Sequence, residues 1–241
     1  MLSAGERPQP PVTPAIVNPS AVPVNKARMM PNLAPNAGSS STPSTMLSEK
    51  RSKPMHVQHI WVVTGPAGCG KSTVGHGLQR ELGVPFLEGD DYHSASNKEK
   101  MGNGIPLTDE DRWDWLISLR KAATDILVPS DANNFRPPAG VVVACSALKQ
   151  KYRDVVRIAA YGSPSVQIHF VYLKLDESVL MQRVRQRESH YMKSDMVRSQ
   201  LQALEEPRDE WDTITINVED SPEEVQQHVL DAVTAKLSEY L

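Results

Sequence analysis

Short apolar runs rich in β-branched residues alternate with segments of helical periodicity from residue 59 to the end of this 241-residue chain. This alternation is typical of an α/β protein, in which helices cover both faces of a parallel sheet. We therefore expect three layers, with the sheet in the middle. The predicted strands span residues 59–64, 85–88, 141–145, 167–173 and 213–218.

Helix start and stop signals fall between these strands. Apolar residues recur every four positions over residues 74–82, and Gly83 then supplies a stop signal. Asp176 is placed to cap a helix over the apolar positions that follow it. Ser-Pro-Glu-Glu at 221–224 is a capping box with proline at the first helical position, and it predicts a last amphipathic helix. Residues 129–139, rich in Asn and Pro, predict an exposed loop.

The first 55 residues differ in composition from the rest of the chain. They hold 10 of the 19 prolines and no Phe, Trp or Tyr, and they carry six basic residues against two acidic ones. A segment with nothing large to bury cannot offset the entropy of ordering its backbone, so we expect a disordered Pro/Ser-rich tail over 1–55 and one folded domain over 56–241. A basic, acid-poor tail can also be a mitochondrial transit peptide. Its scattered arginines and its prolines favour an inert or regulatory tail instead.

Charge, cysteine content and hydropathy exclude several broad classes. The chain carries 26 Lys+Arg against 29 Asp+Glu, a net charge of −3, whereas general nucleic-acid binders usually have a basic excess. Two cysteines cannot form a disulfide framework and favour a reducing compartment. No run of 18 apolar residues occurs, so we expect no membrane span and a cytoplasmic protein that binds neither nucleic acid nor membrane.

Residues 65–73 match the phosphate-binding P-loop motif G-x-x-x-x-G-K-[ST]. A predicted strand precedes the motif and a predicted helix follows it, which is the context that the motif requires. Glycines let successive backbone N–H groups turn toward phosphate oxygens, and the helix directs its positive end at them. Lys71 would reach the β- and γ-phosphates, and the Ser72 hydroxyl would bind Mg²⁺. The predicted nucleotide-binding residues here are Gly65, Pro66, Ala67, Gly68, Cys69, Gly70, Lys71, Ser72 and Thr73.

A P-loop leaves the acceptor of the phosphate open, and three classes compete: GTPase switches, mechanical ATPases and small-molecule kinases. A GTPase needs an N-K-x-D guanine-binding motif, but residues 97–100 read Asn-Lys-Glu-Lys. A mechanical ATPase usually has an apolar strand ending in Asp-Glu, but the strand at 141–144 is followed by Cys145-Ser146. Together with the small size of the domain, these departures favour a small-molecule kinase.

Candidate acceptor-side residues follow the second and third strands. Asp90 lies at the carboxyl end of a strand beside the P-loop, where it could orient or deprotonate an attacking hydroxyl, or merely cap the next helix. His93 could bind the acceptor or be a structural hydrogen-bonding group. Ser146 can cap a helix on which Lys149 and Arg153 share one face. These cations could bind an anionic acceptor or form a solvated surface.

Two arginines follow the fourth strand. Arg183 and Arg187 also share a helical face. In a kinase they would close over the phosphates and neutralise the charge that develops during transfer, and otherwise they belong to an ordinary charged helix surface.

With these residues assembled, the chain from residue 56 to 241 resembles the gluconate kinase (gluconokinase) family of P-loop small-molecule kinases. Beyond the P-loop, the resemblance rests on Gly89-Asp90, His93, Asn97, Lys100-Met101, Gly104-x-Pro106-Leu107, Asp109-x-Asp111-Arg112-x-x-Trp115-Leu116, Cys145-Ser146-Ala147-Leu148-Lys149-x-x-Tyr152-Arg153-Asp154, Arg187-x-x-His190-Tyr191 and Ser199-Gln200-x-x-x-x-Glu205-x-Pro207.

The resemblance implies a nucleotide-kinase-like fold, with a five-stranded parallel sheet and a mobile helical lid at about 183–207. It implies Mg²⁺-dependent transfer of phosphate from ATP to D-gluconate, giving 6-phospho-D-gluconate for the pentose phosphate pathway, and often a homodimer. The implied roles are catalysis for Lys71, Asp90 and Arg187, acceptor binding for Asp90, His93, Arg112, Lys149 and Arg153, ATP contacts for Arg183 and Arg187, and Mg²⁺ binding for Ser72. Two alternatives stay open: a kinase for another small acceptor such as shikimate, and a nucleotide-binding regulatory protein without catalysis.

Overall fold

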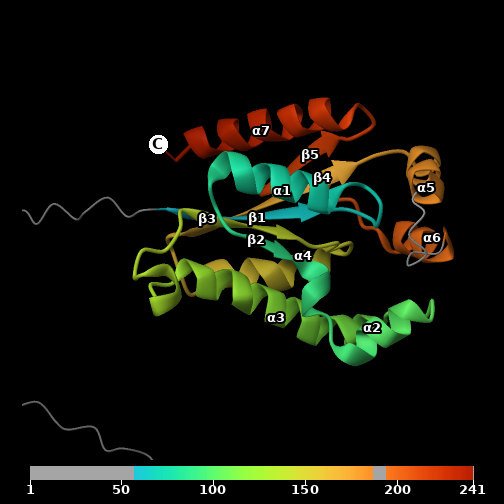
Figure 1. Cartoon of the computed structure of the whole chain (residues 1–241), viewed down its shortest axis with the longest axis horizontal. Helices are drawn as coiled ribbons and strands as arrows, with labels where there is room; N and C mark the ends of the chain where they lie inside the picture. The colour runs from blue at the N-terminus through green and yellow to red at the C-terminus, as the bar shows by residue number, and fades with distance from the viewer. Residues whose placement is uncertain (1–56, 187–193, 241) are drawn as a thin grey trace, which may run out of the picture. The chain divides into compact units, whose positions relative to one another are not determined.

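The computed structural model describes residues 57–186 and 194–240 (Figure 1). Its centre is a five-stranded parallel sheet in the order β2-β3-β1-β4-β5. Each predicted strand is confirmed, with both ends within one residue of the prediction. The strands are β1 (Gln58–Thr64), β2 (Phe86–Glu88), β3 (Gly140–Ala144), β4 (Val166–Lys174) and β5 (Thr213–Asn217).

Two layers of helices enclose the sheet, as the sequence predicts. One face carries α1 (Lys71–Leu82) and α7 (Pro222–Ser238), and the other carries α3 (Asp109–Leu127) and α4 (Gln150–Arg157) (Figure 1). Successive side chains of β1 enter opposite cores: those of Trp61 and Val63 pack toward α1 and α7, and those of Ile60 and Val62 pack toward α3 and α4. Burial on both faces explains why the middle of the strand, residues 60–63, is an unbroken apolar run.

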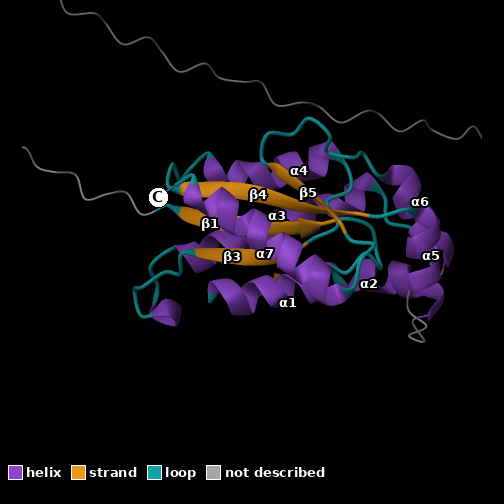
Figure 2. Ribbon diagram, turned by 90° about the horizontal axis from the view of Figure 1, so that it is seen from above, coloured by secondary structure: helices purple, strands orange, loops and turns teal. Residues whose placement is uncertain are grey.

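Three further helices lie beyond the carboxyl ends of the strands. They are α2 (Ala95–Gly102), α5 (Glu177–Gln186) and α6 (Ser194–Ala203), and both ribbon views place them at the same end of the molecule (Figures 1 and 2). The carboxyl edge of a parallel sheet is where open α/β folds bind ligands. Three short 3₁₀ turns complete the described structure, at Gly89–Tyr92, Asp131–Asn133 and Ile158–Ala160.

The helix boundary signals are confirmed with one exception. α1 ends at Gly83 in the left-handed conformation, α5 begins directly after Asp176, and α7 begins with the capping box at Ser221. The prediction that Ser146 caps a helix is wrong. The N-cap of α4 is Lys149, because the chain continues past β3 in an irregular segment before the helix starts. The sequence signals that we used did not predict α2 and α3.

Several predictions lie outside the described residues. These are the tail over 1–55 and residues 187–193 of the predicted lid, including Arg187. Within the described ranges, none of the helices combines the length and the apolar character needed to cross a membrane.

Candidate active site

The P-loop connects the end of β1 to the start of α1. Its three glycines all adopt positive φ angles, +145° at Gly65, +91° at Gly68 and +106° at Gly70. A Cβ on Gly68 would lie 2.8 Å from Cγ2 of Val184 in α5, whereas a Cβ on Gly70 would meet no atom within 4 Å. The loop is thus packed against α5 on one side and open at Gly70, which leaves room for phosphate oxygens in front of the helix N-terminus.

Lys71 and Cys69 differ in what they offer to a ligand. The ammonium of Lys71 donates to the carbonyl of Pro66 at 3.0 Å and lines the pocket beside the loop. Cys69 is buried, and burial raises the pKa of its thiol, so that it stays protonated at neutral pH. Lys71 is therefore the group of this loop that can reach phosphates, and the Cys69 side chain packs in the core.

Side-chain oxygens that could bind a metal ion lie beside the loop, at the start of α1 and the end of β2. Ser72, Thr73, Glu88 and Asp90 line a hollow together with loop residues. Among the described residues, no three or more His, Cys, Asp or Glu side chains are grouped so that they could hold a metal ion alone. Mg²⁺ usually takes one or two carboxylates and completes its shell with phosphates and water. The residues present therefore fit a Mg²⁺ ion that binds together with nucleotide phosphates.

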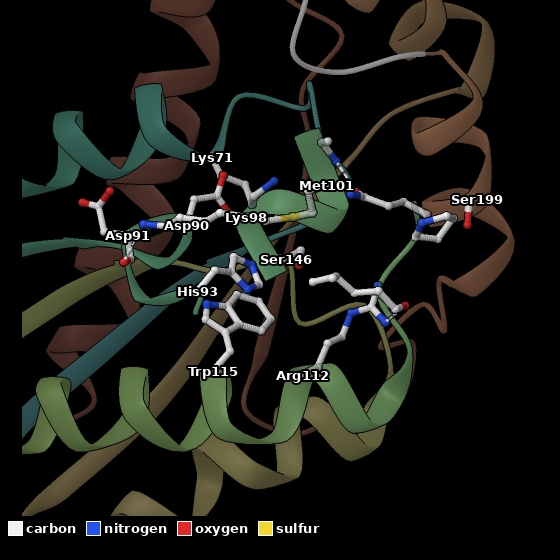
Figure 3. A pocket seen from close by; sticks show the side chains of 14 residues that line it. Lys71, Asp90, Asp91, His93, Lys98, Met101, Arg112, Trp115, Ser146 and Ser199 are labelled. Carbon is white, nitrogen blue, oxygen red and sulfur yellow. Dashed lines mark hydrogen bonds between the residues drawn. The ribbon is translucent and has the colours of Figure 1, made fainter. Parts of the chain in front are cut away.

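A pocket of about 200 Å³ opens next to this hollow (Figure 3). The lining comes from the P-loop, the segment after β2, α2, the start of α3, the segment after β3, and α6. In Figure 3, Asp90 and Asp91 lie across the pocket from Ser199. The lining residues are Ala67, Lys71, Asp90, Asp91, His93, Lys98, Met101, Pro106, Leu107, Arg112, Trp115, Ser146, Ser199 and Gln200. Of the predicted acceptor-binding residues, Asp90, His93 and Arg112 are thus brought together with Lys71.

His93 is held in the wall of this pocket by the indole of Trp115. The two rings lie against each other in Figure 3. Their centroids are 4.2 Å apart and their planes meet at 17°, and the Trp115 indole N–H donates to the carbonyl of Gly89 at 2.7 Å. Burial lowers the pKa of His93 to about 4. The imidazole is therefore neutral at physiological pH and can both donate and accept a hydrogen bond.

The segment that carries Asp90 passes very close to β3. A Cβ on Gly89 would lie 2.3 Å from the carbonyl oxygen of Ala144, so only glycine fits there without a shift of the backbone. This approach places Asp90 at the end of β2, next to the P-loop. Its position is that of the predicted group at the carboxyl edge of the sheet.

Arg112 is a cation in the pocket wall that has no acidic partner within the described ranges. It extends from the first turn of α3, and its Nη1 donates to the carbonyls of Leu107 and Thr108. These carbonyls hold the guanidinium but do not neutralise its charge. Lys98 of α2 also lines the pocket, and its ammonium donates to the carbonyl of Asp91 at 3.1 Å. The pocket therefore offers positive charge to an anionic ligand.

Lys149 and Arg153 differ from the prediction, because neither lines this pocket. The ammonium of Lys149 donates to Asp109 Oδ1 at 2.9 Å, and Lys151 and Tyr152 bind the same carboxylate. These three hydrogen bonds hold the pKa of Asp109 well below its usual range. Lys149 therefore connects the start of α4 to the start of α3, and its charge is already paired.

Arg153 is buried, with 1% of its surface exposed. Its guanidinium donates to the Glu210 carboxylate through Nε and Nη2, to the carbonyls of Ala147 and Leu148 through Nη1, and to the carbonyl of Glu205 through Nη2. Every N–H of this guanidinium thus has a protein acceptor, and a ligand would have to displace one of them. The geometry gives Arg153 a structural position.

A second pocket extends from the other side of the P-loop. Arg183 lines it, and Nη2 of this arginine donates to the carbonyl of Val218 at 2.6 Å. The predicted lid arginine therefore reaches the loop between β5 and α7. Gly68, Cys69, Gly70, Thr73, Val74, Arg183, Gln186, Val218, Asp220, Pro222, Val225 and Gln226 line this pocket.

Reasoning from the sequence missed several lining residues. Lys98 entered only as part of an incomplete guanine-binding motif, and no binding role was predicted for Ser146. Trp115, Ser199 and Gln200 belong to the strings on which the family resemblance rests, and that membership is the signal that could have marked them. Nothing in their local spacing indicates a pocket.

Comparisons with known proteins show which family the chain is similar to. The family model described as "AAA domain" matches residues 60–210. The chain is 42% identical over 183 residues to the "Probable gluconokinase" of Schizosaccharomyces pombe, covering 76% of this chain and 91% of the relative. It is 35% identical over 179 residues to the "Thermoresistant gluconokinase" of Escherichia coli, covering 74% of this chain and 95% of the relative.

A solved structure gives the same assignment. The gluconokinase from Sinorhizobium meliloti 1021 superposes with a TM-score of 0.63 at 40% identity, over 78% of this chain and 96% of that chain. The similarity thus extends over nearly the whole length of each of these relatives. From this agreement of sequence and fold, the chain belongs to the gluconokinase family of P-loop kinases.

Proposed function

We propose that this protein transfers the γ-phosphoryl group of ATP to the C6 hydroxyl of D-gluconate, forming ADP and 6-phospho-D-gluconate. The observation that carries the proposal is the acceptor pocket, in which Asp90 and Lys71 lie on the side of the P-loop and Arg112 supplies an unpaired cation. A polyhydroxy acid has the two complementary features, a hydroxyl to be phosphorylated and a carboxylate to be anchored.

Asp90 is the group placed to act on the attacking hydroxyl. It lines both the hollow beside the P-loop and the acceptor pocket, so it borders the donor and the acceptor sites. Its carboxylate accepts the hydroxyl proton as the bond from O6 to the γ-phosphorus forms. The bond from that phosphorus to the β–γ bridging oxygen breaks, and its electron pair leaves with ADP. Positioning and electrostatic stabilisation supply most of the catalysis in such transfers.

The P-loop holds the phosphates. Backbone N–H groups from Gly68 to Thr73 and the ammonium of Lys71 bind the phosphate oxygens. Ser72 would hold Mg²⁺, with Glu88 and Asp90 close enough to orient its water ligands. The ion would neutralise charge on the β- and γ-phosphate oxygens during transfer.

The remainder of the nucleotide fits the second pocket. Arg183 borders it and is fixed by the carbonyl of Val218, while Val225 and Pro222 supply apolar surface for a base. Because Gly68 and Gly70 line this pocket as well, it continues directly from the phosphate-binding loop. Arg187, which lies outside the described residues, comes four residues after Arg183 in the sequence and is proposed to contact the phosphates.

We propose that Arg112 binds the carboxylate of the acceptor. The spacing of Lys149 and Arg153 suggested those cations instead, but both are committed to carboxylates of the protein. Arg112 has no carboxylate partner among the described residues, so its charge is available to the carboxylate of the acceptor. His93, which is neutral, is proposed to bind a hydroxyl of the sugar acid.

The test is ADP release by the purified protein with Mg-ATP and one of several acceptors: D-gluconate, 5-keto-gluconate, shikimate, glycerate, AMP or none. We expect release that depends on gluconate and is lost in Lys71→Ala. Release with a different acceptor would contradict the assignment of gluconate as the substrate but would still show that the protein is a small-molecule kinase. If ATP binds and no acceptor stimulates release, the protein is a nucleotide-binding module and the proposal fails.

Two further properties are proposed on the family resemblance. A homodimer predicts a mass of twice the 26.7 kDa chain in light scattering. A cytoplasmic location predicts recovery of the native protein in the soluble cytosolic fraction, apart from mitochondria.

A further inference from the structure

A side-chain amide from α6 is hydrogen-bonded to the P-loop. The backbone N–H of Ala67 donates to Oε1 of Gln200 at 2.7 Å. Since a backbone N–H can only donate, this contact also fixes which end of the carboxamide faces the loop. The oxygen is bound to Ala67, and the amide nitrogen, with its two N–H donors, is on the other side of the group.

The amide nitrogen of Gln200 is free to bind a ligand. No acceptor among the described residues takes a hydrogen bond from Nε2, and this atom is not among the buried polar atoms that lack a partner. Gln200 lines the acceptor pocket together with Lys71 and Asp90. Two uncharged donors are therefore held at the border between the P-loop and the pocket where the acceptor hydroxyl is proposed to bind.

The packing of α6 holds Gln200 in this position. Val197, on the same helix, is fully buried in the core that also contains Leu180 of α5, and Leu201 packs against that core. The adjacent P-loop residue Gly68 faces Leu180, so α5 and α6 meet the loop at neighbouring positions. The contact at Ala67 thus belongs to a packed junction.

The chain after α6 is anchored as well. The backbone N–H of Glu205 donates to the carbonyl of Leu148 at 2.9 Å, and its carboxylate accepts from the N–H of Gln150 at 2.7 Å. Arg153 donates to the carbonyl of Glu205 at 3.0 Å. These bonds connect α6 to the segment after β3 that lines the same pocket. Gln200 is therefore preorganised relative to both the P-loop and the acceptor site.

We propose that Gln200 is a catalytic residue of the phosphoryl transfer. Its Oε1 stays bound to Ala67, and its Nε2 donates a hydrogen bond to an oxygen of the phosphoryl group while that group passes from ADP to the acceptor. Gln200 transfers no proton, since the hydroxyl proton goes to Asp90. Negative charge on the equatorial oxygens is stabilised by fixed donors, so the contribution is to kcat. This inference rests on the proposed function.

Two substitutions separate the roles of the two ends of the carboxamide. Gln200→Met keeps the volume of the side chain and removes both the acceptor oxygen and the donor nitrogen. Gln200→Glu keeps an acceptor for the Ala67 N–H and removes the two N–H donors. The matched control is Gln202→Ala, which changes an exposed glutamine on the same helix. The measurements are kcat, the KM values for gluconate and ATP, and the thermal midpoint of each variant.

We expect kcat to fall by about 10²–10³-fold in both Gln200 variants, as when a single preorganised donor is removed from an active site. The KM for ATP and the thermal midpoint should remain close to those of Gln202→Ala. An unchanged kcat in Gln200→Glu would overturn the inference, because it would show that only the anchor at Ala67 matters. An unchanged kcat in Gln200→Met would overturn it too, as would losses that follow the thermal midpoint. Failure of the proposed function is a separate result, since the unsubstituted protein would then show no gluconate-dependent ADP release.

Discussion

The guanidinium of Arg153 and the carboxylate of Glu210 form a buried ion pair between α4 and the segment that precedes β5. The side chains are 2% and 13% exposed, and both the Nε and Nη2 groups of Arg153 donate to the carboxylate. Burial tends to raise the pKa of Glu210, but hydrogen bonds from Arg153 and Arg157 outweigh it and hold the pKa below its usual value. The pair links α4 to the segment of chain between α6 and β5.

We therefore expect Arg153→Ala to lower the free energy of unfolding by roughly 3–5 kcal/mol, because it leaves a carboxylate buried with too few partners. Arg153→Lys keeps the charge but cannot make five hydrogen bonds, so it should fall between Arg153→Ala and the unsubstituted protein. Denaturant unfolding followed by tryptophan fluorescence measures both.

Arg208→Ala is the control, because its side chain is 76% exposed and pairs only at the surface with Glu206. It should change stability by less than about 0.5 kcal/mol. Unchanged stability in Arg153→Ala, combined with a strongly raised KM for gluconate, would contradict the structural role and restore Arg153 to the acceptor site.

Arg112→Gln should weaken acceptor binding selectively. A lost charge-assisted hydrogen bond of about 1.5–3 kcal/mol corresponds to a rise of about 10–100-fold in the KM for gluconate, with the KM for ATP nearly unchanged. An uncharged hexitol, which has no carboxylate to lose, should bind the two proteins equally. Steady-state kinetics checks this expectation, with Lys121→Gln as an exposed control on the same helix. Equal KM values for gluconate would show that Arg112 does not anchor the carboxylate.

The strands could be predicted closely because their signals are local. A buried run such as Gly140–Ala144 is apolar at every position, and Gly83 ends α1 through its own backbone conformation. The P-loop was predictable for the same reason, since the chemistry of phosphate binding requires a contiguous set of residues.

The partners of the charged side chains could not be predicted. Lys149 and Arg153 lie four residues apart, and this spacing is the same whether they face a ligand or a carboxylate of the protein. Their actual partners, Asp109 and Glu210, are 40 and 57 residues away along the chain. Local spacing carries no information on such distant contacts. The choice between an acceptor site and an internal ion pair therefore required the three-dimensional structure.

Asp90→Asn should retain ATP binding and lose turnover. The substituted amide cannot accept the hydroxyl proton, so we expect kcat to fall by at least about 10²-fold while the dissociation constant for ATP changes little. Equilibrium binding of ATP and single-turnover product formation measure the two effects separately. Asp114→Asn, an exposed change on α3, serves as the control. Turnover close to that of Asp114→Asn would assign Asp90 to a helix-capping role.

The last prediction concerns a buried histidine within β4. His169 is 1% exposed, its Nε2 lies 3.1 Å from Nδ1 of His59, and its ring stacks on Trp61 at 4.3 Å. Burial, helped by the charges of His59 and Lys236, lowers the pKa of His169 to about 3. The folded protein therefore holds this imidazole neutral, whereas the unfolded chain protonates it near the ordinary pKa of 6.5.

Below pH 6.5 the unfolded state binds one proton more than the folded state at this site, so the free energy of unfolding falls as the pH falls. The slope from one such group approaches about 1.4 kcal/mol per pH unit, and the full contribution is present above pH 6.5. His93, with its pKa lowered to about 4, adds a second contribution of the same sign.

His169→Gln removes the titration at this site and keeps an amide that can bond to His59. Between pH 6.5 and 4.5 the free energy of unfolding of this variant should fall less steeply than that of the unsubstituted protein, by up to about 1.4 kcal/mol per pH unit. Above pH 6.5 the two curves of stability against pH should run parallel. Denaturant unfolding at several pH values measures this difference, and the lower limit avoids the titration of Asp111, whose pKa is lowered to about 2. Parallel curves throughout would mean that His169 is protonated in the folded protein, which its burial against His59 and Trp61 argues against.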